Sequence, residues 1–315
     1  MIAWLLLALG VALRAEQAET WTKVTSPYFT ILTPADEHTA RAWAVELEEF
    51  RRGMQSFVPV PVEKLRPVTV VLFANEKAME PYLPLENGHP ARMGGYFARA
   101  DEINTIMLSL EGNREEVRHT IYHEAVHWYL SAFEGPMPLW LGEGLAELYA
   151  TFELTGAKTY TVGNLIGSYV TLLRREPFMP LVRLFGTGRE SLLYNEGTRA
   201  SIFYAQSWAL VHYLFYGESS PGRESILQYL HLLALNQSAD EAFQQAFGAT
   251  HGEIEKRLRT YIMRGSYRKH RYKRSTDDLS RLVKVSKASP GDVDLAQGAL
   301  LLGSRSPEAA EASLR

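Results

Sequence analysis

The hydrophobic pattern divides the chain into a first part with strand character and a longer helical part. Residues 21–32, 94–100 and 103–110 are rich in β-branched and aromatic residues, and residues 67–73 form a short apolar run. Such segments, bounded by turn-forming residues, predict β-strands. Two helices are predicted among these strands, over residues 35–57 and 75–82, because apolar positions recur there at the helical period.

From Asn113 onward the helical period dominates. Residues 113–133 predict a long helix with Asn113 as N-cap and Glu116 as its capping-box partner. Gly135 and Pro136 end this helix, and a second helix is expected to run from Pro138 to about residue 154. Further helices are predicted over residues 164–175, 198–216, 224–235, 238–247 and 252–263. The expected class is α+β, with an N-terminal mixed or antiparallel sheet and a mostly helical second half.

The first residues predict a leader in front of one large domain, residues 19–265. Residues 2–13 are almost purely apolar and are followed by small residues, as in a secretory signal peptide. We therefore expect residues 1–18 to be a signal peptide and the protein to be exported, to the periplasm or the extracellular space. A buried first helix or a short membrane anchor is the alternative. No later segment has 18 consecutive apolar residues, so the mature chain is not expected to span a membrane.

After the large domain the chain becomes basic and then helical again. Residues 266–276 are predicted to form a solvated basic linker, with binding to a membrane surface or a partner as the alternative. Residues 277–315 predict a short helical tail whose Leu, Ala and Gly positions are similar to part of a tetratricopeptide repeat. A tail of this kind would offer a surface to a protein partner.

Composition and charge narrow the classes of function. The formal net charge of -3 gives no reason to expect nucleic acid as a partner. The chain has no cysteine, which excludes disulfides, cysteine zinc ligands and a thiol nucleophile.

The long predicted helix carries the strongest chemical motif, H-E-x-x-H, formed by His123, Glu124 and His127. Residues four apart lie on one helix face, so the two imidazoles can bind one metal ion. Neutral imidazole suits Zn²⁺, with bonds of about 2.0–2.1 Å. Glu124 projects beside that face. From there it can take a proton from a zinc-activated water and later deliver one to the leaving amine.

A catalytic zinc site needs a third protein ligand, and Glu143 on the second helix is the best candidate. Glu147 lies one turn further along and can fix the orientation of a ligand histidine by accepting a hydrogen bond. Two exposed helix carboxylates are the alternative interpretation. His119 lies one turn before His123, but three histidines on one straight helix would extend over about 12 Å, too far to share an ion easily. His119 is interpreted as a neighbour of the site or as incidental.

Two segments together resemble the gluzincin clan of zinc metallopeptidases. They are the H-E-x-x-H motif and the later segment Trp140-Leu141-Gly142-Glu143-Gly144-Leu145-Ala146-Glu147. The combination is most similar to secreted, peptidase-MA-like bacterial members that carry tetratricopeptide repeats. The resemblance implies a zincin-like fold and one Zn²⁺ per chain, held by His123, His127 and Glu143. It also implies Glu124 as the general base.

A second similarity lies in residues 204–211. There Tyr204 matches a tyrosine that supplies the oxyanion donor in gluzincin aminopeptidases. The alternative is a core tyrosine on an aromatic-rich helix. His212 is a weaker candidate for the same role.

The resemblance to aminopeptidases fails where those enzymes bind the free amine of their substrate. A G-A-M-E-N-like segment is missing, and residues 94–97 at the comparable place carry no acid. Asp101 and Glu102 are nearby but unmatched. The expected function is therefore zinc-dependent hydrolysis of peptide bonds in a peptide or protein, by an endopeptidase. The alternatives are a zinc amide hydrolase acting on a non-protein or cell-wall substrate, and a weakly active binding protein with a gluzincin fold.

The predicted strand pair over residues 94–110 comes directly before the motif helix. In zinc proteases of this general architecture, the strand before the active-site helix is often an edge strand that pairs with an extended substrate. An ordinary sheet strand is equally compatible with the sequence.

Overall fold

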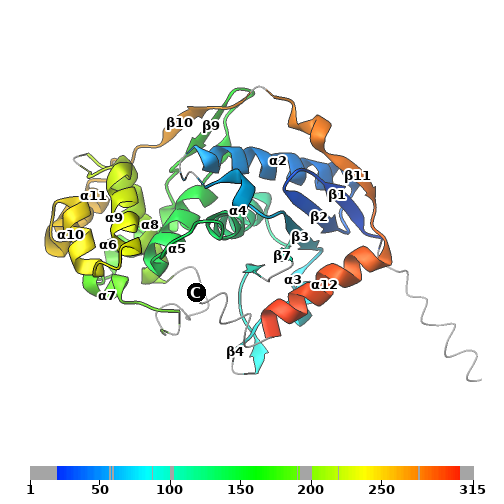
Figure 1. Cartoon of the computed structure of the whole chain (residues 1–315), viewed down its shortest axis with the longest axis horizontal. Coiled ribbons are helices and arrows are strands. Elements are labelled where there is room, and N and C mark those ends of the chain that lie inside the picture. The colour runs from blue at the N-terminus through cyan, green and yellow to red at the C-terminus, as the bar shows by residue number, and fades with distance from the viewer. Residues whose placement is uncertain are drawn as a thin grey trace, which may run out of the picture.

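The computed structural model describes residues 20–305 except 57, 59, 87, 100–102, 190, 192–200, 219 and 276. The expected signal peptide, Asp101, Glu102 and residues 306–315 lie outside this part. Eleven α-helices and eleven strands in three sheets occur among the described residues, so the α+β class is confirmed. Figure 1 shows a large sheet on one side and a cluster of helices on the other. None of the described helices is long and apolar enough to cross a membrane.

The largest sheet has six strands in the order β11-β1-β2-β3-β7-β6. Parallel pairing joins β2 to β3 and β3 to β7, and the other neighbours are antiparallel, so the expected mixed sheet is confirmed. β6 is at one end of this order and forms an edge. The strand bounds are β1 Thr22–Thr25, β2 Phe29–Thr33, β3 Val68–Phe73, β6 Gly95–Ala98, β7 Asn104–Ser109 and β11 Lys284–Lys287.

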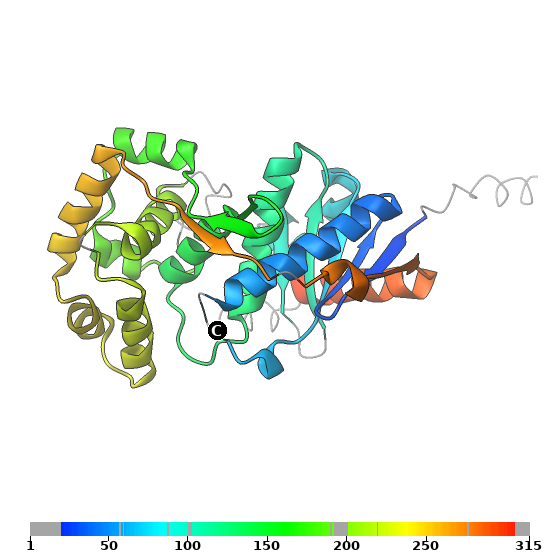
Figure 2. The same cartoon turned by 90° about the horizontal axis from the view of Figure 1, so that it is seen from above.

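Both faces of this sheet are covered, because alternate strand residues point to opposite sides. Val70 and Ile106 join the main core, which also contains buried residues of α2 (Glu37–Gln55) and α4 (Arg114–Leu130). Val71 and Met107 face the other way, toward α12 (Pro290–Arg305). Figures 1 and 2 show α12 on the side of the sheet away from α2.

The segment predicted as one strand over residues 21–32 is a hairpin of β1 and β2. The amide of Ser26 donates to the carbonyl of Phe29 at 2.8 Å, which closes a tight turn around Pro27. Proline favours the second position of such turns because its φ angle is already set. The continuous β-branched pattern concealed this reversal.

Side-chain hydrogen bonds fix the start of the motif helix and the end of the helix that follows it. The Asn113 side chain accepts hydrogen bonds from the amides of Glu115 and Glu116, which confirms it as the N-cap of α4. Helix α5 (Leu139–Ala150) is shorter than predicted. It ends because the Thr151 hydroxyl accepts from the amides of Gly163 and Asn164, and the chain turns into a small sheet.

The second half is mostly helical, as expected. Helix α8 lies in its centre and is buried along almost its whole length. The helices are α6 Gly167–Arg175, α7 Leu181–Phe185, α8 Ile202–Tyr216, α9 Arg223–Ala234, α10 Ala239–Phe247 and α11 His251–Arg264. The remaining short elements are η1 Val62–Lys64, α3 Glu76–Met79, η2 Glu80–Tyr82, β4 Leu85–Glu86 and β5 His89–Pro90.

The basic segment predicted as a linker contains a strand, β10 (His270–Lys273). It pairs with β9 (Thr159–Val162), which in turn pairs with β8 (Glu153–Leu154). Arg274 forms an ion pair at 2.7 Å with Glu49, a buried residue of α2. Figure 2 shows this strand running from the helical cluster back toward the large sheet. The positive charge of Arg274 therefore holds this segment against α2.

The segment predicted as a separate helical tail also belongs to the domain. It contains η3 (Leu279–Leu282), then β11, which pairs with β1, and then α12. Helix α12 packs on the sheet through Ala296 and Leu300. A tetratricopeptide unit requires two helices packed on each other, so the described part of the tail differs from that expectation.

Gly144 allows α5 and α8 to approach closely. A Cβ atom at this position would lie 2.5 Å from both the Ser207 carbonyl oxygen and Cγ2 of Val211. We expect Gly144→Ala to reduce the free energy of unfolding by about 1–3 kcal/mol, measured by chemical denaturation. Gly142→Ala is the matched control. Its Cβ would meet only Met137 at 3.6 Å, so this change should be neutral or stabilise by up to about 1 kcal/mol. Equal effects of the two changes would contradict the steric explanation.

Candidate metal centre

Helices α4 and α5 bring His123, His127 and Glu143 together. Nε2 of His123 lies 3.1 Å from Nε2 of His127. Oε2 of Glu143 lies 3.3 Å from the first of these nitrogens and 3.5 Å from the second. Three atoms that prefer to ligate a metal thus form a nearly equilateral triangle.

These distances fit a tetrahedral ion. Ligand atoms about 2.0–2.1 Å from such an ion lie about 3.3–3.4 Å from each other. The three residues can therefore hold a metal ion without rearrangement. His119 is not part of this triangle, because it points toward Glu147 instead.

The two neighbouring histidines favour the ionised form of Glu143 in spite of its burial. The side chains of His123 and Glu143 are 4% and 2% exposed, whereas His127 is 23% exposed, so the cluster is open on the His127 side. Burial by itself raises the pKa of Glu143. The charge of His127 and hydrogen bonds from the two histidines outweigh burial, so the pKa lies well below its usual value.

Glu147 connects His123 to His119. Its Oε1 lies 3.1 Å from Nδ1 of His123, and its Oε2 lies 3.0 Å from Nε2 of His119. Glu147 is fully buried, which raises its pKa, but the hydrogen bonds from both histidines reverse the effect and lower it. A carboxylate at Nδ1 keeps the proton on that nitrogen and leaves the Nε2 lone pair of His123 for a metal.

Glu147→Gln is expected to weaken metal binding by about 10–100-fold, since an amide orients His123 less strongly. Competition with a chromogenic chelator measures this affinity. Glu153→Gln, an exposed carboxylate on β8, is the control and should leave the affinity unchanged. An unchanged affinity in Glu147→Gln would show that the contact with His123 is only structural.

Glu124 is buried beside the edge strand β6. A Cβ atom on Gly95 would lie 3.1 Å from Cγ of Glu124 and 2.6 Å from Cγ2 of Thr120, so only glycine permits this approach. Burial and the charge of Glu124 both raise the pKa of the neighbouring Tyr96. Gly95 was not a candidate in the sequence, where the Gly94-Gly95 pair signals only a turn or bulge.

The two candidates for an oxyanion donor are both on α8. Tyr204 is half-buried, contacts Phe203 edge-to-face, and lies one turn before Ser207, which packs against Gly144 beside Glu143. His212 is fully buried. Its Nε2 donates to the Gly163 carbonyl at 3.1 Å, and its Nδ1 accepts from the Tyr261 hydroxyl at 2.7 Å.

Because both ring nitrogens of His212 have partners inside the protein, it is not available to a substrate. Burial lowers its pKa to about 4, which keeps it neutral. The weaker suggestion that His212 supplies the oxyanion donor is therefore wrong.

Residues 118–240 are similar to a protein family of unknown function, DUF1570. The matched segment begins within α4 and ends within α10, so it contains all three residues of the cluster together with Glu124, Glu147 and Tyr204. No curated protein gives a match to the chain.

Proposed function

We propose that this protein is a zinc metallopeptidase of the gluzincin type that acts as an endopeptidase. The observation that carries the proposal is the triangle of His123 Nε2, His127 Nε2 and Glu143 Oε2, with sides of 3.1, 3.3 and 3.5 Å. Two imidazoles and one carboxylate are the ligand set of thermolysin-like catalytic zinc sites. The partial exposure of His127 leaves room for a fourth position.

The residues around the cluster have distinct roles in this proposal. When bound, zinc supplies a Lewis acid and lowers the pKa of a coordinated water toward neutrality. Glu124 accepts a proton from the attacking water and delivers one to the leaving amine. Glu147 fixes His123, and His119 holds the other oxygen of Glu147. Tyr204 is the proposed donor to the oxyanion, worth about 2.7–4 kcal/mol at the transition state.

The substrate is proposed to lie along β6. This strand is an edge of the six-stranded sheet, and Gly95 brings it against Glu124. An extended peptide that pairs with such an edge is held by main-chain hydrogen bonds. Its scissile bond would then pass close to the general base. This arrangement favours a peptide or protein substrate over a compact amide.

Export is part of the same proposal. It rests on the apolar run of residues 2–13, which has the length of the hydrophobic region of a signal peptide. The absence of cysteine is compatible with export, since the chain has no disulfide to form.

Cleavage of a peptide library by the purified protein, with zinc measured on the same sample, tests the proposal. We expect about one zinc per chain and cleavage that stops on chelation and returns with zinc. Zinc binding without cleavage of any peptide would favour the amide-hydrolase alternative. A protein that fails to bind zinc at any loading would overturn both.

A further inference from the structure

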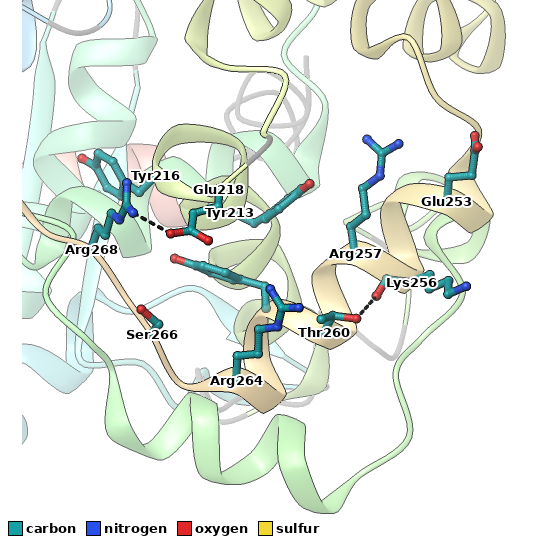
Figure 3. Close-up of a pocket in the computed structure, with 11 residues that line it drawn as sticks. Tyr213, Tyr216, Glu218, Glu253, Lys256, Arg257, Thr260, Arg264, Ser266 and Arg268 are labelled. Atoms are coloured by element: carbon teal, nitrogen blue, oxygen red, sulfur yellow. Dashed lines mark hydrogen bonds and ion pairs between the residues drawn. The ribbon is translucent and has the colours of Figure 1, made fainter.

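A cavity of about 460 Å³ lies in the helical half of the molecule, away from the metal centre. Its walls come from α8, α11 and the segments that follow them, and none of its lining residues belongs to α4 or α5. Helix α8 separates the two places. Its residues Ser207 and Val211 contact Gly144 of α5, whereas Tyr213 lies on the other side of the helix and faces the cavity. Figure 3 shows the residues around this space.

The cavity has an excess of positive charge. It is lined by four basic side chains and by only two carboxylates, Glu218 and Glu253. Glu218 forms an ion pair with Arg268 at 2.6 Å, and Glu253 accepts hydrogen bonds from Thr250 in a capping box. The other three cations have no ion pair with a carboxylate within 4.0 Å among the described residues: Lys256, Arg257 and Arg264. Positive charge without a counterion in a concave site attracts anions.

Aromatic side chains form the inner wall. Tyr213 and Tyr261 lie with ring centroids 5.5 Å apart, and Tyr216 continues the wall. The Tyr261 ring is fixed because its hydroxyl is bonded to His212. Flat apolar walls of this kind suit a ring or another flat group of a ligand.

The Tyr213 hydroxyl is the second observation that indicates a ligand. Tyr213 is 2% exposed, and its hydroxyl lies beside the guanidinium of Arg257, which interacts with it. Figure 3 shows this hydroxyl pointing toward the side of the cavity that holds Arg257. A tyrosine hydroxyl next to a guanidinium can accept from the arginine and still donate its own proton, so the pair offers an anion two donors.

We infer that this cavity binds a small organic anion, in which a phosphate or carboxylate is attached to an aromatic ring or another flat apolar group. The anionic group meets Arg257, Arg264 and the Tyr213 hydroxyl, and the flat group packs on the tyrosines. The volume is within the usual range for small-molecule sites, about 300–1,000 Å³. The inference does not depend on the proposed peptidase activity, because the two sites share no residue.

Calorimetric titration of the full chain with phenyl phosphate, benzoate and phenol tests this inference. Excess EDTA is present throughout, so that no anion binds at the metal centre. We expect phenyl phosphate or benzoate to bind, and phenol to bind at least about 10-fold more weakly, since it lacks the charge. The stronger of the two anions identifies the natural ligand as a phosphate or a carboxylate.

Variants locate the site. Arg257→Gln and Arg264→Gln should each weaken binding of the preferred anion by about 10-fold. Tyr213→Phe should weaken it several-fold, because the hydroxyl that donates to the anion beside Arg257 is lost. Arg175→Gln removes the same charge from an exposed position on α6 and should have no effect.

Three results would overturn the inference. The first is that neither anion binds at millimolar concentration. The second is that phenol binds as tightly as the anions. The third is that Arg175→Gln weakens binding as much as Arg257→Gln does.

Discussion

Glu124→Gln is expected to bind zinc as the wild type does and to lose about 10²–10⁴-fold in peptide hydrolysis, because the amide cannot accept the proton of the attacking water. Glutamine has the same size, which matters because Glu124 is buried and lies against Gly95. Glu124 is also outside the triangle of His123, His127 and Glu143, so the change should leave the metal affinity intact. Turnover of a cleavable library peptide and zinc content, measured on the same preparation, give the two readouts.

The matched control is Glu115→Gln, an exposed carboxylate in the first turn of the same helix. It should keep full activity. If Glu124→Gln also loses zinc, Glu124 helps to hold the metal and the assigned roles are wrong. If it keeps full turnover, another group is the base, and the proposed mechanism fails.

Local periodicity was sufficient to predict the part of the site that one helix carries. His123 and His127 are four residues apart, so any α-helix places them on one face. The N-cap at Asn113 could be predicted for the same reason, because capping depends on residues within one turn. The position of Glu143 beside the two histidines could not be predicted from interactions within one helix. Its helix meets α4 only after the turn around Gly135, whose φ of 147° is outside the range that other residues adopt readily.

Contacts between distant segments were the part that sequence patterns could not supply. β11 pairs with β1 across almost the whole chain, and β10 pairs with β9 across more than a hundred residues. Both strands are short and exposed, with many charged residues, so their composition resembles that of loops. The contact of His119 with Glu147 has the same origin, because it joins two helices and leaves no trace in the spacing along either one.

Glu143→Ala is expected to abolish the stabilisation that zinc gives the wild-type protein. A ligand that binds only the folded state at about 1,000 times its dissociation constant stabilises by about 4 kcal/mol, so zinc should raise the melting temperature of the wild type markedly. The variant keeps only two imidazoles, and its melting temperature should not respond to zinc.

Glu176→Ala, an exposed carboxylate at the end of α6, is the control and should respond to zinc as the wild type does. Comparing the two variants tests whether Glu143 is the third metal ligand. It needs no assay of activity and therefore no known substrate. The ionised Glu143 is held between two imidazoles at 3.3 and 3.5 Å, a geometry that an ion pair alone would also satisfy. A zinc response that persists in Glu143→Ala would mean that the carboxylate serves only as such a partner, and another group would have to complete the metal centre.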